Sequence, residues 1–365
     1  MNTIRTSADI AKALETIKER GGSVYLPAGE YTVNEPIVID TPSSRLQGEV
    51  WAYNLDPNGV FETPYGTKLR LKGKDHPAIS VGVNGLPAGA MVCDIGIQGD
   101  IVGMDTRTMF DIKNPAASAG LYFGSKRVDQ GEFSKISCCG LGAALCFADD
   151  GQIDACNFRG INTDGCCLGV YFAPRAAYYV HFNQCVMADN PSYGFFADGT
   201  STPERKRGIH NMDITNIHFV RNCGASSIKD EVPAAVYLKN ISRCTFRDNV
   251  VDYPGTFWYY PPTATDNRER QISQNQAIGL YIVGNENRIF NNVFTHSSRE
   301  AILIQGSGNV MMCNVADGDV IIEGENNVVN ALSLSKEGRL VLKGAAANTT
   351  HVTAVDEQRI LRVAD

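Results

Sequence analysis

Two polar stretches of the sequence, residues 198–231 and 252–276, contain most of the side chains suited to catalysis. Cleaving a glycosidic bond usually takes two carboxyl groups about 5–10 Å apart, one acting as acid and the other as nucleophile or base. We predict Asp198 as the acid or nucleophile, with Asp189 or Glu204 as its partner. The other candidate acids are Asp230, Glu231, Asp252 and Glu269. Each of these acids also belongs to the residue types that commonly stabilise turns and caps.

The second stretch also contains four consecutive aromatic residues, Phe257 to Tyr260. Aromatic faces stack on the C–H faces of sugars, so Trp258, Tyr259 and Tyr260 are predicted substrate contacts. The alternative is that this segment folds back against a sheet or a neighbouring subunit. The basic residues predicted to orient a substrate, or to pair with the acids, are Arg205, Arg207, His210 and Arg268.

The elements that must position these side chains form a repeat. Nine apolar triplets begin at Leu121, Leu145, Val170, Phe195, Val236, Leu280, Ile302, Val320 and Leu340. The gaps between these first residues are 24, 25, 25, 41, 44, 22, 18 and 20 residues. A β-helix coil takes roughly 20–25 residues, and long insertions in such arrays map to one face. The two longest gaps contain the two polar stretches. A solenoid core does not need these stretches, so we expect them to carry the functional residues.

We therefore predict an all-β protein, a single-stranded right-handed parallel β-helix with an N-terminal capping helix. The predicted helix has Ser7 as its N-cap, buries Ile10 and Leu14, and ends at Gly21. The whole chain, 1–365, is expected to form one domain. Its parts are a cap over 1–35, irregular coils over 36–117, regular coils over 118–350 with insertions near 198–231 and 252–276, and a C-terminal end over 351–365.

The alternative repeat and sheet architectures do not fit the sequence. A leucine-rich repeat requires its Leu/Asn consensus at a single period, which is absent. A doubly wound sheet requires helical patterns between strands, and residues 118–350 contain none that is convincing. Asn-rich turns instead recur between the triplets, and an Asn side chain can hydrogen-bond its counterpart one coil away.

The middle residues of the triplets point outward if their neighbours point into the core. They are Tyr122, Cys146, Tyr171, Phe196, Tyr237, Tyr281, Leu303, Ile321 and Val341. None is charged, so this face is expected to be covered. It is either a subunit interface, an aromatic platform for sugar rings, or a surface beneath local loops.

The amino-acid composition limits the kinds of partner that this protein is expected to bind. A net charge of −7 argues against a nucleic-acid partner. The sequence contains no 18-residue apolar run that would predict a membrane span. The 11 cysteines include no CxxC and mostly lie in apolar runs, so they are expected to be small buried thiols rather than metal ligands. We expect a cytoplasmic location, because the thiols are free and the first segment lacks the apolar core of a signal peptide. No metal and no cofactor are expected.

Segment Ala277–Phe294, with its Gly-Leu-Tyr-Ile strand and Asn-rich turns, resembles the late coils of inulin fructotransferases and difructose anhydride hydrolases. The opening Val24–Tyr31 resembles the first coil of the broader pectin-lyase-like β-helices. The narrower resemblance implies a homotrimer with its active site between subunits, no metal, and a catalytic Asp and Glu near the middle coils. The matching coil is Asp189 to Glu204. The chain departs from the family there, because Pro191 is not followed by Asp-Gly and Asp198 stands where the family has Glu.

Three functions remain open from the sequence. The first is a glycoside hydrolase or intramolecular glycosyl (fructosyl) transferase acting on an oligosaccharide or polysaccharide. The second is a polysaccharide lyase or uronate epimerase, which would release an unsaturated uronate or invert a uronate centre. The third is a non-catalytic glycan-binding trimer, in which the acids are solvated turn residues.

Overall fold

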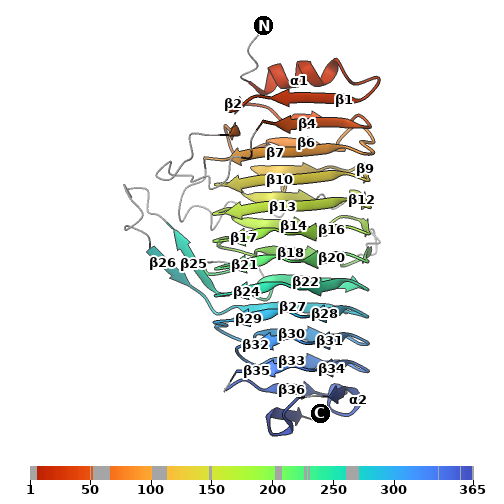
Figure 1. The fold of residues 1–365 in the computed structure, drawn as a ribbon, viewed down its shortest axis with the longest axis vertical. Helices are drawn as coiled ribbons and strands as arrows, with labels where there is room; N and C mark the ends of the chain where they lie inside the picture. Colours follow the sequence, from red (N-terminus) through yellow and green to blue (C-terminus); the bar gives the residue numbers. More distant parts are fainter. Residues whose placement is uncertain are drawn as a thin grey trace.

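The computed structural model describes residues 6–49, 51, 66–100, 113–147, 150–201, 208–225, 228, 231–259, 271–335, 337–353 and 355–363. The chain winds into an elongated right-handed parallel β-helix, with the N-terminal helix at one end and the C-terminus at the other (Figure 1). The all-β solenoid predicted from the triplets is confirmed. No helix among the described residues is long and apolar enough to cross a bilayer.

Within the described residues, two long parallel sheets make up the solenoid, and we name them sheet A and sheet B. Sheet A has 20 strands: β1 (Gly22–Leu26), β2 (Gly29–Val33), β4 (Ser44–Gly48), β5 (Thr67–Leu71), β7 (Met91–Gln98), β10 (Glu132–Cys139), β13 (Asn157–Asp164), β16 (His181–Asn183), β17 (Val186–Ala188), β20 (Asp213–Thr215), β21 (His218–Val220), β23 (Thr245–Arg247), β24 (Val250–Asp252), β28 (Arg288–Phe290), β29 (Val293–Thr295), β31 (Val310–Met312), β32 (Val315–Ala316), β34 (Val328–Asn330), β35 (Ser333–Leu334) and β37 (His351–Thr353).

Sheet B has 16 strands: β3 (Ile37–Ile39), β6 (Ile79–Val81), β8 (Ala119–Phe123), β9 (Arg127–Asp129), β11 (Ala143–Phe147), β12 (Gln152–Asp154), β14 (Leu168–Phe172), β15 (Ala176–Tyr178), β18 (Phe195–Asp198), β19 (Gly208–His210), β22 (Ala234–Ser242), β27 (Ile278–Asn285), β30 (Ile302–Gln305), β33 (Val320–Glu323), β36 (Leu340–Lys343) and β38 (Ile360–Val363). All nine predicted triplets lie in sheet B and pair in register from coil to coil.

The helices cap the two ends of this stack. Helix α1 (Ser7–Glu15) covers the first coil with Ile10 and Leu14 buried, as predicted. Its N-cap is Thr6 rather than Ser7, because the Thr6 side chain and Asp9 form a capping box that satisfies both backbone N–H groups. Short helix α2 (Ala346–Thr349) and the 3₁₀ helix η3 (Glu357–Arg359) lie at the C-terminal end.

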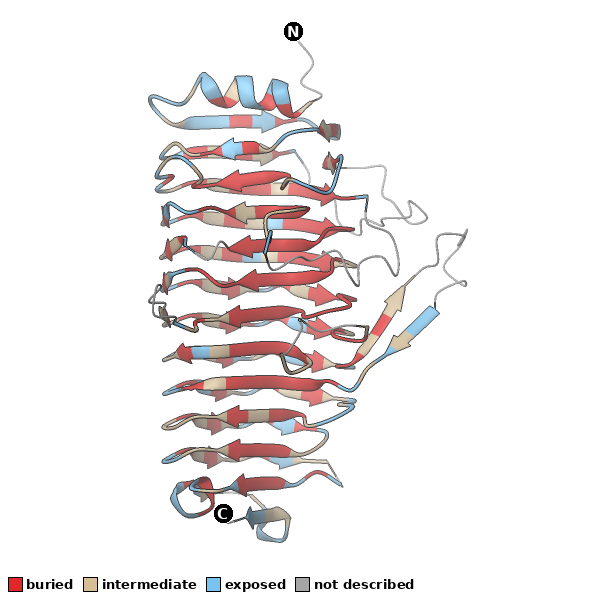
Figure 2. Cartoon of the chain, turned by 180° about the vertical axis from the view of Figure 1, so that it is seen from behind, coloured by how far each residue is buried: buried red, intermediate tan, exposed pale blue. Residues whose placement is uncertain are grey.

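The interior of the coils is filled by buried side chains that stack on their counterparts. Figure 2 shows that most of the strands contain such buried positions. Phe133, Phe158 and Phe182 stack with ring centroids 5.0 and 4.7 Å apart. The predicted asparagine contacts are also present. Asn292 donates from its backbone N–H and from Nδ2 to Oδ1 of Asn314, at 3.0 and 2.9 Å. These ladders satisfy buried turn groups that would otherwise lack partners.

Ten of the eleven cysteines are buried, and Cys313 is exposed. Burial raises the pKa of the Cys185 and Cys223 thiols to about 12, so both stay protonated at neutral pH. The buried thiols therefore pack as small apolar side chains, as the sequence predicts.

One insertion leaves the solenoid. Strands β25 (Thr256–Tyr259) and β26 (Gln271–Gln274) form an antiparallel hairpin that projects from the side of the stack (Figures 1 and 2). It follows β24 directly and belongs to the second polar stretch.

Candidate functional site

Two rows of side chains run in parallel along the outward face of sheet B. The aromatic row consists of Tyr171, Phe196, Tyr237 and Tyr281, which are register partners on β14, β18, β22 and β27. A second row lies two residues further along the strands and consists of Asp198, Lys239, Val283, Gln305, Glu323 and Lys343. All but Val283 are polar, and we name this second row the polar row. Alternate residues of a strand share a face, so both rows point away from the core.

The chain's own loops cover the aromatic row. Tyr237 is only 1% exposed, and the row packs with Tyr193, Ile228 and Val232 from the segments that precede β18 and β22. The Tyr193 hydroxyl donates to the backbone oxygen of Val232 at 3.1 Å. Of the three explanations for this uncharged face, cover by local loops accounts for the burial of the aromatic row without a second subunit.

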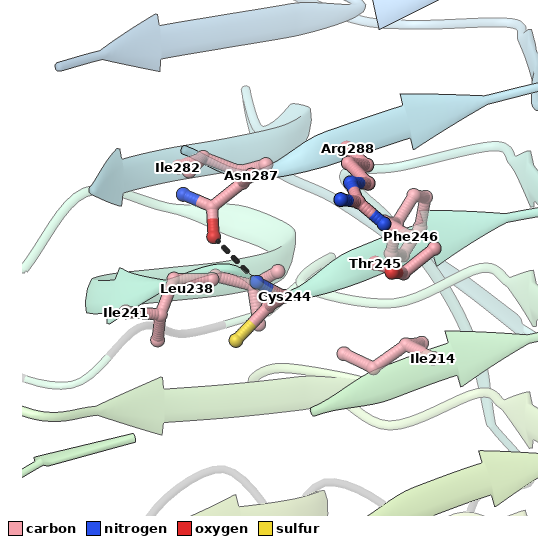
Figure 3. Close-up of a pocket in the computed structure, with 9 residues that line it drawn as sticks. All are labelled: Ile214, Leu238, Ile241, Cys244, Thr245, Phe246, Ile282, Asn287 and Arg288. Carbon is pink, nitrogen blue, oxygen red and sulfur yellow. Dashed lines mark hydrogen bonds between the residues drawn. The ribbon is translucent and has the colours of Figure 1, made fainter. Parts of the chain in front are cut away.

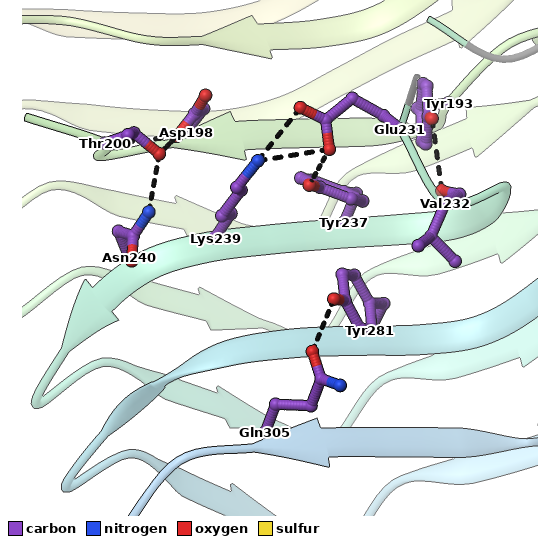
Figure 4. A network of polar contacts seen from close by, with 10 residues as sticks. All are labelled: Tyr193, Asp198, Thr200, Glu231, Val232, Tyr237, Lys239, Asn240, Tyr281 and Gln305. Carbon is purple, nitrogen blue, oxygen red and sulfur yellow. Dashed lines mark hydrogen bonds and ion pairs between the residues drawn. The ribbon is translucent and has the colours of Figure 1, made fainter. Parts of the chain in front are cut away.

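Glu231 brings a carboxylate from that covering segment onto the polar row (Figure 4). Lys239 Nζ lies 3.0 Å from Oε1 and 3.3 Å from Oε2 of Glu231, and the Tyr237 hydroxyl donates to Oε2. Burial, reinforced by the hydrogen bond to Glu231 and its charge, raises the pKa of Tyr237 well above its ordinary value. Tyr237 is therefore a hydroxyl donor throughout the neutral range.

Asp198 is the last residue of β18 and the register partner of Lys239 on β22. Its Oδ1 accepts from the Thr200 backbone N–H at 2.8 Å and from the Thr200 hydroxyl. Asn240 Nδ2 donates to that same hydroxyl oxygen at 2.5 Å. Lys239 is the register partner of Asp198 and contacts Glu231, and in the view of Figure 4 its ammonium group is drawn between the two acids.

The polar row continues past this pair as a hydrogen-bonded chain. The Tyr281 hydroxyl donates to Oε1 of Gln305 at 2.6 Å, and Gln305 Nε2 donates to Glu323 at 2.7 Å. Lys343 Nζ lies 3.2 Å from the other oxygen of Glu323. Three further coils thus offer polar groups on the same face as the two carboxylates.

Asp189 lies in a different environment, beside the base of the hairpin. It is 5% exposed, and its carboxylate receives Arg221 Nε and a second guanidinium nitrogen at 2.8 and 2.6 Å. The Trp258 backbone N–H donates to the same carboxylate at 3.1 Å, and the Arg221 guanidinium lies 4.3 Å from the Trp258 ring centroid. The predicted residues Asp189 and Trp258 therefore come together, but as an anchor for the hairpin rather than beside Asp198.

Replacing Arg221 in this anchor should destabilise the folded protein. Arg221→Met is expected to lower the free energy of unfolding by about 3–5 kcal/mol, because the Asp189 carboxylate is left buried without its cation. Thermal unfolding measures the loss, and limited proteolysis reports detachment of the hairpin. A double variant, Asp189→Asn with Arg221→Met, should recover much of the stability. Wild-type stability of the single variant would contradict this role.

The remaining predicted contacts are dispersed. His210 on β19 stacks against Tyr178, with centroids 5.6 Å apart, and its Nδ1 lies 2.5 Å from the Ser242 hydroxyl. Tyr259 stacks on Phe257 and donates to Gln271 at 2.7 Å. The predicted residues that lie outside the described part of the chain are Glu204, Arg205, Arg207, Asp230, Tyr260, Arg268 and Glu269.

Two participants of the site, Lys239 and Gln305, are not among the predicted site residues. Both lie two positions after a middle residue of a triplet, so strand alternation alone places them on the outward face. Within the described ranges, no three His, Cys, Asp or Glu side chains are grouped as metal ligands.

A void inside the coils is not an alternative ligand site. It lies between Ile214, Leu238 and Phe246, with Cys244 and Asn287 at one side (Figure 3). Its volume is about 10 Å³, which leaves room for no more than a single water molecule. This void therefore cannot hold a sugar ring.

The fold places the chain among the parallel β-helix proteins. No protein-family model matches the sequence, and no curated protein sequence matches it. Among solved structures, DFA-IIIase from Arthrobacter chlorophenolicus A6 without its lid aligns with a TM-score of 0.66 at 13% identity, covering 100% of this chain and 94% of the enzyme. The C387A mutant of that enzyme in complex with DFA-III aligns with a TM-score of 0.65 at 13% identity, covering 100% and 95%. ORF18 of Geobacillus virus E2 aligns with a TM-score of 0.50 at 14% identity, covering 92% of this chain and 55% of that one.

Proposed function

We propose that this chain is a carbohydrate-active enzyme that cleaves or rearranges a glycosidic bond with Asp198 and Glu231 as its carboxylate pair. The observation that carries the proposal is their placement on one outward face, where Lys239 is the register partner of Asp198 and contacts Glu231 (Figure 4). Paired carboxyl groups are the usual machinery for this reaction. The likeness to DFA-IIIase over the whole chain supports a fructan or difructose substrate.

Glu231 replaces Asp189 and Glu204 as the proposed partner of Asp198. Asp189 accepts three hydrogen bonds in the hairpin anchor and is nearly inaccessible to a substrate. Glu231 retains 21% of its side-chain exposure and Lys239 retains 30%. A substrate that lies along the polar row can therefore reach the Glu231 carboxylate.

Product analysis tests the proposal. Inulin, inulin-type oligosaccharides and difructose anhydride III are incubated with the protein, and released sugars are separated by anion-exchange chromatography. A new fructose-containing product supports the proposal. An unsaturated uronate, detected by its ultraviolet absorbance on uronate polymers, would instead support a lyase. Binding by calorimetry without any product would support a glycan-binding protein.

The assembly proposed with this function is a homotrimer, as the family resemblance implies, and an uncharged column on sheet A offers it a surface. The column consists of the register partners Val186, His218, Val250, Val293 and Val315. Val250 and Val315 are 37% and 46% exposed, and the hairpin leaves the solenoid directly after β24. We propose a second copy of the chain as the occupant, because a column of uncharged side chains beside a projecting arm is suited to self-association.

Introducing charged side chains into this column should prevent the association. The double variant Val250→Lys/Val315→Lys is expected to elute as a monomer while the wild type elutes as a trimer, measured by light scattering coupled to size exclusion. Leu86→Lys is the matched control, because Leu86 is 60% exposed at a turn away from the column. A monomeric wild type, or a double variant that still forms trimers, would show that the column is not the interface.

A further inference from the structure

A second group of outward side chains lies where the chain passes from sheet B to sheet A. It consists of Tyr178 at the end of β15, Tyr179 directly after it and His210 at the end of β19, and we name it the corner platform. We propose that the corner platform binds sugar units of a neutral oligosaccharide that extend beyond the bond being cleaved. This inference rests on the proposed glycosidic reaction and enlarges its substrate-binding surface.

Strand alternation directs Tyr178 and His210 away from the core. They are register partners, and the residues before them, Ala177 and Ile209, are buried. The two rings stack across adjacent coils, with centroids 5.6 Å apart and an interplanar angle of 23°. On the other side of Tyr178, the preceding coil has the short Asp154 at the register position. Tyr178 therefore ends the stack and remains 40% exposed.

The fold itself gives no reason for an aromatic residue at position 179. Tyr179 is 57% exposed and has a φ of 54°, a conformation that disfavours bulky side chains. The equivalent corner residues of the neighbouring coils also have positive φ, and none of them is aromatic. They are Gln130, Ala155, Asn211, Arg243 and Glu286. A ring that neither the core nor the turn requires is available for a ligand.

The neighbours of His210 hold its ring in place. Nδ1 lies 2.5 Å from the hydroxyl of Ser242, its register partner on β22. A Cβ atom at Gly208 would lie 2.7 Å from Nε2, so a larger residue there would displace the ring. The stacked part of the corner platform is therefore formed before a ligand arrives, which limits the ordering cost of binding.

A polar strip on β22 connects the corner platform to the carboxylate pair. Asn240 Nδ2 donates to the Thr200 hydroxyl oxygen, and this hydroxyl donates to Asp198 (Figure 4). Ser242, which contacts His210, follows on the same outward side of β22. At about 3.3 Å per residue, Asn240 and Ser242 lie about 7 Å apart along the strand. An oligosaccharide whose reacting bond lies at the carboxylate pair can thus extend along this strip to the corner platform.

The groups around the corner platform suit a neutral sugar. Aromatic faces stack on the C–H faces of sugars, and the Ser242 hydroxyl can hydrogen-bond a sugar hydroxyl. The charged groups beside the platform are paired with one another. Arg243 lies 2.8 Å from Glu286, and Arg127 lies 3.0 Å from Asp154. A charged sugar such as a uronate would have to compete for these cations with carboxylates that already contact them.

Two substitutions remove the aromatic surface one ring at a time. Tyr179→Asn gives this corner the residue type that Asn211 supplies one coil further, at the same φ of 54°, so the turn is preserved. Tyr178→Ala removes the stacked ring. The matched control is Tyr253→Ala, because Tyr253 is 41% exposed and stacks on His296 with centroids 3.9 Å apart, at a turn after β24 of sheet A.

Calorimetric titration with difructose anhydride III and with an inulin-type hexasaccharide measures the effect. The wild type should bind the hexasaccharide more tightly, because only the longer ligand reaches the corner platform. Tyr178→Ala and Tyr179→Asn should each weaken hexasaccharide binding about 10-fold and leave difructose anhydride III binding unchanged. Tyr253→Ala should change neither affinity. Melting temperatures of all the variants confirm that each is folded.

The outcomes separate this inference from the proposed function. A wild type that binds the hexasaccharide no more tightly than the difructose would overturn the inference. So would folded platform variants that keep wild-type affinity for the hexasaccharide, or that lose affinity for both ligands equally, even if the protein turns over sugars. A selective loss of hexasaccharide binding in a protein that turns over none of the sugars would uphold the binding surface and refute the proposed reaction.

Discussion

Asp198→Asn is expected to lower turnover of the glycan substrate at least about 10²-fold, the low end of what a positioned acid or base contributes. Asn has nearly the same shape as Asp but cannot donate an acidic proton or act as a carboxylate. Its side-chain oxygen can still accept from the Thr200 backbone and hydroxyl, as Oδ1 of Asp198 does. The variant should therefore keep its fold and melting temperature while losing its chemistry.

The control for this variant is Asp213→Asn. Asp213 belongs to β20 of sheet A, where it pairs with His181 at 3.0 Å, and it has no contact with the polar row among its described interactions. Its substitution should leave kcat and KM unchanged. Initial rates across a range of substrate concentrations make the comparison. If Asp198→Asn turns over at the wild-type rate, Asp198 has no part in the mechanism.

The coil architecture can be predicted because local sequence patterns determine it. A triplet such as Val236-Tyr237-Leu238 identifies a strand by its alternation, and the spacing to the next triplet sets the coil length. Parallel stacking then needs no further information, since every strand pairs with its equivalent one coil away. The N-cap is displaced by one residue because Thr6 and Ser7 are both suitable types, and only the capping box with Asp9 decides between them.

The site is less predictable because its parts come from different insertions. Asp198 ends a regular strand, so its outward direction follows from alternation. Glu231 reaches the same face only because the segment before β22 folds back over the aromatic row. The contact between Asp189 and Trp258 spans 69 residues and depends on how the hairpin leaves the coil. Local patterns carry no information about such loop paths, and tertiary packing decides them.

Glu231→Gln provides the second test of the carboxylate pair. We expect this substitution to lower turnover at least about 10²-fold. A Gln oxygen can keep the hydrogen bond from Tyr237, whereas the amide has no charge to offer Lys239 or an anomeric carbon. The matched control is Glu323→Gln, which removes an acid from the same face three coils beyond Lys239, where it contacts Gln305 and Lys343. That control should change KM more than kcat. Equal losses of kcat in the two variants would remove the special role of Glu231.

Combining the two substitutions distinguishes a catalytic pair from two independent contributors. If Asp198 and Glu231 act in one step, the double variant Asp198→Asn/Glu231→Gln should be only slightly slower than either single variant, because losing one member already disables the step. Independent contributions would instead multiply to at least about 10⁴-fold. Lys239 is the register partner of Asp198 and contacts Glu231, and the double variant leaves it with neither charge, so the melting temperature of the double variant must be measured alongside the rates. A multiplicative loss with an unchanged melting temperature would show that the two acids do not share a step, and the proposed mechanism would fail.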